Sequence, residues 1–441
     1  MMLSFRRAIP VAAAMIGAGA LLSGCELGGR NEPAPPATVK VMTSASSTFY
    51  SQYGGLFMAL HPNVDLELLA PPDGADLASF VRENSPDVLL LSASEYERLA
   101  QDGLLEDLGP RIRKDKYPLD GTVPTVVDAL RSLGGGALYG LSPSFSGQAL
   151  YYNKDLFRQE GVPLPQAGMS WGEILRLAER FPTNGNDSDR IYGFMSNAYS
   201  ANPFEFALMV GSSEGMDYLD RDKLQMKIDT DRWKEVFGLV LDALKSGAIY
   251  QAGQAPQPGA TYAESLRQHP FIAGRAAMTV ATGDLMTELQ RAEAVMRTPD
   301  WDVAAVPDGS LEVNDIFAVY RGAAQPDLAW ELVKYVNSDD YARIASKDAR
   351  FGSMTSRLAY LKDEAGRHLE AFYQGSASLP GSPGKVPQSF YASFDPMSKA
   401  EIGKVLDGTQ SLDEALAAVQ SQGQAMLMLA AKKQKEQTGN E

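Results

Sequence analysis

In the first part of the chain, the spacing of hydrophobic positions switches between the period of a β-strand and the period of an α-helix. Residues 39–43 form a strand-like run, and residues 46–60 place their aromatic side chains mostly at helical spacing. Residues 64–68 alternate as in a strand, residues 76–84 indicate a short helix, and residues 87–91 are a continuous apolar run typical of a buried strand. This β-α-β-α-β order predicts a largely parallel sheet with helices on its faces.

The same two periods continue through the rest of the chain. Ser170 with Glu173, and Ser411 with Glu414, fit capping boxes that begin helices. Residues 231–246 predict another helix, which ends at a glycine. Further strands are expected at 276–281, 301–306 and 316–320, with helices at 284–296 and from Pro326 onward.

The amino terminus has the organisation of an export signal. Arg6 and Arg7 precede an apolar run, residues 8–22, that is too short to span a membrane. Leu-Ser-Gly-Cys follows at 22–25, and Cys25 is the only cysteine, so disulfides are excluded. The stretch resembles the lipobox of bacterial lipoproteins. That resemblance implies a signal peptide at 1–24, cleavage before Cys25, and lipidation of its thiol, with palmitate among the acyl groups.

Composition limits what the remaining chain can be. Residues 25–38 are rich in Pro, Gly and Ala and predict a lipid-anchored flexible tether. The body that follows, 39–431, is long for one core, which predicts two lobes. A net charge of −15 disfavours nucleic acid and anionic lipid as direct partners. The charged tail, 432–441, is expected to be disordered.

Several separated motifs occur in an order that is informative when they are taken together. They are SPDV at 85–88, LAQDGLL at 99–105, LYGL at 138–141, LYYNKDLF at 150–157, Ser170-Trp171, FIAGRAAM at 271–278 and Ala329-Trp330. In this order they resemble extracellular solute-binding proteins of ABC importers. The closest likeness is to the carbohydrate-type group, to which maltose-binding protein belongs, and it covers nearly all of 39–430.

That resemblance implies an α/β fold of two lobes, joined by hinge strands, with an interlobe ligand cleft whose closure signals to the permease. The chain is expected to cross between the lobes near 141–145, near 312–319 and a third time near 351–357. The implied segments are 39–142 with 313–354 for lobe 1, and 143–312 with 355–431 for lobe 2.

The resemblance also implies partners and a location. The expected partners are a small polar ligand, most of all a carbohydrate, and the transmembrane subunits of an ABC permease. The protein is expected to be a monomer that needs no cofactor or metal and catalyses no reaction. The membrane is contacted through the lipid on Cys25. The protein is therefore expected to be exported and held at the outer face of the cell membrane, on the surface of a monoderm or the periplasmic side in a diderm.

A sugar cleft needs flat apolar faces for ring C–H groups and fixed donors and acceptors for hydroxyls. Loops at the carboxyl ends of parallel strands bring such groups together. Most of these candidates also have a packing or helix-capping explanation. The candidate ligand-binding residues are Ser46, Phe49, Tyr50, Ser94, Glu95, Phe145, Ser146, Tyr199, Asn202, Phe204, Asp284 and Tyr391.

The sequence departs from oligosaccharide binders at two of these places. Thr-Gly-Asp-Leu at 282–285 stands where they commonly have Gly-Pro-Trp, so one stacking platform is absent. Ser94-Glu95 replaces the acidic-basic pair of maltose-binding protein. The departure leaves the sugar, and even the ligand class, open; Phe390 and Tyr391 could supply a ring instead.

The adjacent pair Tyr151-Tyr152 raises a different hypothesis, because some iron-capturing relatives use adjacent tyrosines. Successive strand side chains point to opposite faces, so the two rings cannot readily grip one ion. We expect one ring to pack under helices and the other to line the hinge or cleft.

Other functions stay open. A surface glycoside hydrolase would use two carboxylates, and a metal- or peptide-binding receptor, or a subunit that only senses or docks, could share the fold. No phosphate-loop, zinc-protease or nucleophile-elbow motif is present, and the three histidines are scattered.

Overall fold

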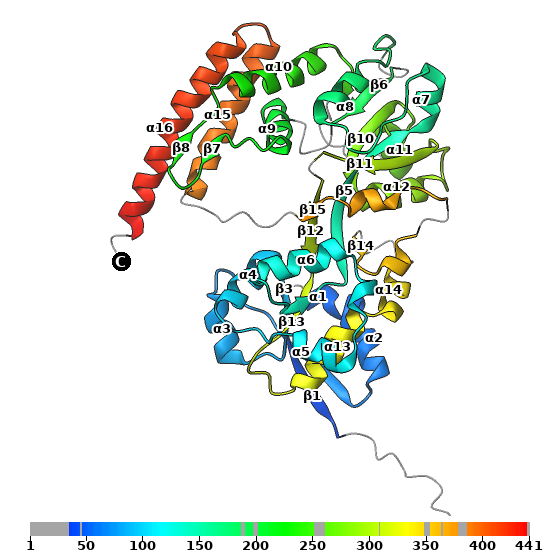
Figure 1. Ribbon diagram of the computed structural model, residues 1–441, viewed down its shortest axis with the longest axis vertical. Coiled ribbons are helices and arrows are strands. Elements are labelled where there is room, and N and C mark those ends of the chain that lie inside the picture. The colour runs from blue at the N-terminus through cyan, green and yellow to red at the C-terminus, as the bar shows by residue number, and fades with distance from the viewer. Residues whose placement is uncertain are drawn as a thin grey trace, which may run out of the picture.

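The structure of the chain is a computed structural model that describes residues 35–44, 46–186, 190–196, 202–250, 261–307, 309–347, 353–362, 365–377 and 386–438. The predictions for the signal peptide, Cys25, most of the tether and Tyr199 lie outside these residues. Figure 1 shows two groups of helices and strands, one above the other, joined by a narrow set of strands that includes β5 (Ser144–Asn153).

The lower group is built on a five-stranded sheet. Its strand order is β2 (Val64–Leu69), β1 (Ala37–Met42), β3 (Val88–Leu91), β13 (Ile316–Val319) and β4 (Gly140–Leu141). The first three strands pair in parallel, as their β-α-β-α-β order predicts. β13, which comes from far along the chain, pairs antiparallel with both β3 and β4, so the sheet is mixed.

Helices cover this sheet because their apolar residues recur on one side. Phe49, Tyr53 and Phe57 are four residues apart and all buried. The helix expected over 46–60 is one helical run whose middle turn has π geometry. The helical elements of this group are α1 (Ser46–Phe49), η1 (Tyr50–Gly54), α2 (Gly55–Leu60), α3 (Leu77–Asn84), α4 (Ala93–Gln101), α5 (Gly109–Asp115), η2 (Leu119–Gly121), α6 (Pro124–Leu133), α13 (Pro326–Val336) and α14 (Asp339–Ala345).

The upper group surrounds β5, which is the longest strand described. β10 (Ala276–Thr282), β11 (Trp301–Ala305), β12 (Ser310–Asn314) and β14 (Met354–Thr355) all pair antiparallel with β5. β6 (Tyr192–Met195), β9 (Ile249–Tyr250) and β15 (Ser376–Ala377) extend the sheet on either side, and β7 (Leu219–Asp220) and β8 (Gln225–Met226) form a separate hairpin.

The helices of the upper group begin where the sequence supplies caps. Ser170 Oγ accepts a hydrogen bond from the Glu173 amide at 3.3 Å, which is the predicted capping box. The elements are α7 (Lys154–Glu160), α8 (Trp171–Ala178), α9 (Pro203–Ser213), α10 (Asp231–Lys245), α11 (Tyr262–Gln268), α12 (Gly283–Ala292), η5 (Leu369–Phe372), α15 (Gln388–Leu406) and α16 (Leu412–Thr438). The short turn η4 (Leu358–Tyr360) contacts α14 of the lower group. Within the described residues, no helix combines the length and apolar character needed to cross a membrane.

The carboxyl-terminal helix corrects one expectation. α16 lies along α15 and continues through Thr438, so residues 432–438, expected to be disordered, are helical (Figure 1). Leu427 and Ala430 are still buried just before this stretch. Lys, Gln and Glu are good helix formers, and an established helix extends at little free-energy cost. Strand β1 likewise begins at Ala37, inside the segment expected to be tether.

The chain passes between the two sheets at three places. It leaves β4 for β5 at 142–143, and it returns between β12 and β13 at Asp315. After β14, Arg357 forms a bridge with Thr122 of the lower group. These places agree with the crossings expected from the sequence. The lobe boundaries, which state which residues move together, stay a prediction.

Arg357 anchors the third crossing to the lower group. Its side chain is 5% exposed. It donates to Asp339 Oδ1 at 2.6 Å, to the Pro118 carbonyl at 3.0 Å and to Thr122 Oγ1 at 3.1 Å. A buried guanidinium needs this many partners to replace its lost hydration. The position of the chain after β14 is therefore fixed relative to the lower sheet.

Gly147 tests how tightly β5 is packed. A Cβ atom built there would overlap the carbonyl oxygen of Phe372 in η5, whereas Gly238 in α10 has open space around it. We expect Gly147→Ala to lower the free energy of unfolding by about 1–3 kcal/mol through overpacking. Gly238→Ala should instead raise it by about 0.5–1 kcal/mol. Urea unfolding of both variants measures the two values. Equal effects in the two variants would contradict the close contact at Gly147.

Candidate ligand cleft

Strand β5 presents two different faces at the junction of the two groups. Phe145, Ala149 and Tyr151 share one face and are fully buried. Leu150 and Tyr152 share the other face and belong to the core beneath α7 and α8. Nearer the lower group, this second face carries Ser144, Ser146 and Gln148, all of them part-exposed. The face that is apolar inside the upper group thus becomes polar where no core covers it, and we call this polar part the hinge floor.

Strand β12 adds a carboxylate to the hinge floor. Glu312 lies directly opposite Ser146 in the antiparallel pair, so the two side chains share a face. Its neighbours Leu311 and Val313 point the other way and are buried. Glu312 is exposed and makes no hydrogen bond or ion pair with any part of the chain that the structure describes. The hinge floor therefore offers an unpaired acceptor beside a hydroxyl group.

A small hollow of about 50 Å³ lies at the end of the hinge floor nearest the lower group. Asp315 Oδ2 accepts a hydrogen bond from the Tyr53 hydroxyl at 2.9 Å. Burial raises the pKa of Asp315 and also raises the pKa of Tyr53. We call this hollow the Asp315 pocket. It is lined by Gln52, Tyr53, Pro143, Ser144, Asp315, Tyr341, Ala345, Ser346, Ser353 and Thr355.

A larger hollow of about 210 Å³ adjoins the Asp315 pocket and shares four lining residues with it. Its upper wall is α12, from Gly283 to Gln290, and its lower wall includes the end of α14. Lys347 and Lys362 also line it, together with Thr287 and Tyr360. Both groups of helices and strands thus contribute to one continuous set of polar walls. Movement of the groups relative to each other would change the shape of these hollows.

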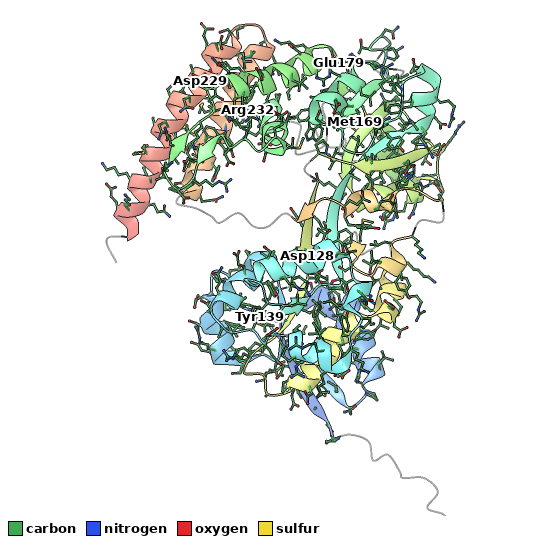
Figure 2. The ribbon with its side chains drawn as sticks, viewed as in Figure 1. Asp128, Tyr139, Met169, Glu179, Asp229 and Arg232 are labelled. Atoms are coloured by element: carbon green, nitrogen blue, oxygen red, sulfur yellow. The ribbon has the colours of Figure 1, made fainter. Side chains whose placement is uncertain are left out.

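Figure 2 shows how side chains fill the space around this junction. Asp128, which is labelled there, lies on α6 at the edge of the lower group that faces the upper group. α6 packs against β12 and β15, and the Thr125 hydroxyl donates to the Tyr373 carbonyl at 2.8 Å. These contacts place α6 beside the strands that join the two groups.

Three predicted aromatic ligand contacts are core residues in this arrangement. Phe49 packs on Tyr53 with ring centroids 5.9 Å apart, and Phe145 meets Tyr373 edge-on at 6.2 Å. Phe204 lies 5.6 Å from Phe237. Each of the three is fully buried. The Ser- and Gly-rich composition around Phe145 is typical of a loop, but β5 begins at Ser144 and gives Phe145 a regular apolar face. Packing accounts for all three rings.

Two other predicted rings keep exposed surface. Tyr50 is 42% exposed, and its hydroxyl donates to the Leu66 carbonyl at 2.7 Å. Tyr391 is half-buried near the start of α15, against the fully buried Phe390 at 5.2 Å. These tyrosines remain predicted ligand contacts, and Tyr199 lies outside the described residues.

Five of the six predicted polar contacts lie at or near the amino-terminal ends of helices, and the sixth, Ser146, lies on β5. Glu95 completes a capping box of α4, in which its Oε2 accepts from the Ser92 amide at 2.8 Å. Asn202 Oδ1 caps α9 by accepting from the Phe204 amide at 3.1 Å. The other three lie close to similar turns: the Ser46 hydroxyl faces the Thr43 carbonyl at 3.5 Å, Ser94 Oγ is 3.3 Å from Ser92 Oγ, and Asp284 Oδ2 accepts from the Thr282 hydroxyl at 3.0 Å.

Of the six predicted polar residues, two lie near the hinge floor and the larger hollow without lining either hollow. Ser146 is on the hinge floor, and Asp284 follows Gly283, which lines the larger hollow. Asp284 is exposed in the first turn of α12, where a carboxylate is favoured by the helix dipole. Helix capping accounts for Glu95 and Asn202 without a ligand, and ligand contact at all these positions stays a prediction.

The adjacent tyrosines occupy opposite faces, as expected. The Tyr151 ring lies 5.4 Å from Trp301, and its hydroxyl donates to the Thr282 carbonyl at 2.8 Å. Tyr152 packs on Phe157 at 6.1 Å. Burial raises the pKa of Tyr151, and it raises that of Tyr152 to about 12. The expectation that the second ring lines the hinge or cleft is wrong, because both tyrosines are buried in the cores on the two sides of β5.

The sequence reasoning missed two carboxylates, Glu312 and Asp315. Glu312 stands between Leu311 and Val313, and this alternation marks it as the outward residue of a strand. Its pairing partner Ser146 is 166 positions away, and no local pattern reports that pairing. Asp315 has a φ of 52°, an uncommon conformation for a residue other than glycine.

Comparison with known proteins agrees with this architecture. The curated "Putative binding protein BAB2_0491" of Brucella abortus (strain 2308) is 22% identical over 373 residues, which cover 81% of this chain and 83% of the relative.

Solved structures show the same fold. The sugar-binding protein MalE from Xanthomonas citri has a TM-score of 0.61 at 18% identity, covering 92% of this chain and 100% of that one. The sugar transporter RHE_PF00321 from Rhizobium etli, in an open conformation, has a TM-score of 0.56 at 18% identity, covering 88% of this chain and 99% of that one. The ABC substrate-binding protein Lmo0181 from Listeria monocytogenes, in complex with cycloalternan, has a TM-score of 0.54 at 18% identity, covering 88% of this chain and 98% of that one.

The family model described as "Bacterial extracellular solute-binding protein" matches residues 40–343, well over half of the chain. Its match spans β1 to α14 and includes the hinge floor. The chain belongs to the bacterial extracellular solute-binding protein family.

Proposed function

We propose that this protein is the substrate-binding component of an ABC importer and captures a carbohydrate between its lobes for delivery to a membrane permease. The observation that carries the proposal is the hinge floor, where hydroxyl groups and the unpaired carboxylate of Glu312 lie between two α/β lobes. Three crossings connect the lobes, so closure over a ligand needs only local changes in a few residues.

The chemistry of the hinge floor suits a neutral polyhydroxylated ligand. A carboxylate accepts hydrogen bonds from two neighbouring hydroxyls, and serine hydroxyls both donate and accept. Hydrogen bonds to a charged group are roughly twice as strong as neutral ones. Relatives of this fold include a protein named for sugar binding and one solved with cycloalternan, which supports the same ligand class.

The proposal includes anchoring of a monomer at the membrane through Cys25. The Leu-Ser-Gly-Cys motif supports it, and the family supports export. We expect mass spectrometry of the protein extracted from membranes to show acyl chains on Cys25, and Cys25→Ser to remain unprocessed and unlipidated. A wild-type protein released without acyl groups would contradict the anchor and leave the ligand proposal intact.

Ligand capture should be visible in the purified protein. We expect a bound sugar to raise the melting temperature by several degrees, because a ligand at 100 times its Kd adds about 2.7 kcal/mol to stability. The radius of gyration from X-ray scattering should fall as the lobes close. A broad panel of mono- and oligosaccharides that produces neither change, together with a non-carbohydrate ligand retained through native purification, would contradict the carbohydrate proposal.

Glu312 should contribute strongly to affinity for a sugar identified in that panel. We expect Glu312→Gln to raise Kd by about 10- to 100-fold, because loss of a hydrogen bond to a charged group costs about 1.5–3 kcal/mol. Isothermal titration calorimetry measures the change. Glu83→Gln is the matched control, since Glu83 is exposed on α3, away from the hinge floor. An unchanged Kd in Glu312→Gln would show that the carboxylate does not face the ligand.

A further inference from the structure

The Asp315 pocket is the one described hollow that touches all three crossings. Ser144 comes from the first crossing, Asp315 from the second and Thr355 from the third. Tyr53 and Tyr341 close it from the lower lobe, and their rings stack at 5.7 Å. A group bound in this pocket would therefore contact every connection between the lobes at once.

Only one of the two carboxylate oxygens of Asp315 accepts a hydrogen bond from the described residues. Asp315 Oδ2 accepts from the Tyr53 hydroxyl, while Oδ1 has no hydrogen-bond partner among the described residues. Among the described residues that line the pocket there is no lysine, arginine or histidine. Asp315 is half-buried, so a donor from an occupant would complete the hydrogen bonding of Oδ1 where access to water is reduced. Burial also raises the pKa of Asp315, which suits a neutral donor better than a cation.

Hydroxyl groups on the pocket walls complete the recognition of an alcohol. Ser144 and Thr355 face each other across the β5–β14 pair and share one side of it. The Thr355 oxygen accepts from the Arg357 amide at 3.2 Å, which leaves its hydroxyl hydrogen to donate. An alcohol oxygen between these groups can donate to Asp315 and accept from a wall hydroxyl.

The size of the pocket selects a small group. A volume of about 50 Å³ holds a few waters at about 10–15 Å³ each. It takes one hydroxymethyl arm and excludes a whole sugar ring. The adjoining hollow of about 210 Å³ and the hinge floor leave space outside for the ring that carries the arm.

We propose that the Asp315 pocket binds the primary alcohol of the ligand, the exocyclic hydroxymethyl group of a sugar or the end of a polyol. This inference rests on the proposed function. Asp315 accepts the alcohol proton in a hydrogen bond, and no bond is made or broken. Because the walls come from all three crossings, the occupant binds best to one arrangement of them and shifts the lobes toward it.

The test uses sugar pairs that differ only in hydroxymethyl arms: one arm between D-glucose and D-xylose, and two arms between cellobiose and xylobiose. Calorimetry on the full protein should show the hydroxymethyl member binding at least about 10-fold tighter to wild type. In Asp315→Asn this ratio should fall below about 3-fold, while the Kd for the member without the arm stays nearly unchanged. Asp65→Asn, an exposed change on β2, is the matched control and should keep the wild-type ratio.

Three outcomes overturn the inference. If the affinity ratio between the members of a pair is the same in Asp315→Asn as in wild type, the pocket does not recognise the hydroxymethyl group, and the proposed function is unaffected. A ligand without a primary alcohol, identified by mass spectrometry after native purification, leads to the same conclusion. Wild type that binds no member of either pair, and retains no carbohydrate, overturns both proposals. If Asp315→Asn fails to fold by circular dichroism, Ser144→Ala gives the same measurement on another wall of the pocket.

Discussion

The alternation of side chains along β5 is the constraint on which the rest of the structure depends. This single strand runs from the junction into the upper lobe, and the side chains of each face alternate with those of the other along its whole length. Phe145 and Tyr151 must lie on the face covered by η5 and Trp301, which places Ser144 and Ser146 on the opposite face. A slip of one residue would turn serines into the core and Phe145 into the cleft. Core and cleft are therefore specified together.

The connections between the lobes combine rigid contacts with few residues free to bend. Arg357 holds the third crossing on the lower lobe, and Gly147 lets η5 approach the backbone of β5. Between these fixed points only short segments remain, among them Asp315 with its positive φ. Closure by rotation about such segments preserves both cores, because packed interiors do not deform continuously.

Local sequence patterns were enough to predict most elements, whereas the three crossings were expected from the family resemblance. Apolar spacing and capping boxes act over a few residues, so they report helices such as α8 and strands such as β2 directly. The site depends on pairings across the chain. The Ser/Gly-rich composition around Phe145 indicates a loop, but pairing with β12 and β14 imposes a strand. Glu312 and Asp315 acquire their places only through these distant partners, which the sequence does not report.

Charge along the cleft argues for a ligand without net charge. Glu312 lies on the hinge floor and Asp315 lines the small pocket at its end, while Lys347 and Lys362 line the adjoining larger hollow. An anionic ligand would gain at the lysines and be repelled at the carboxylates, and a cation would meet the reverse. A neutral polyol avoids both penalties because its hydroxyls donate to the carboxylates and accept from the ammonium groups. The walls of the cleft would thus disfavour charged ligands of either sign. This local balance of charge differs from the net charge of −15 carried by the whole chain.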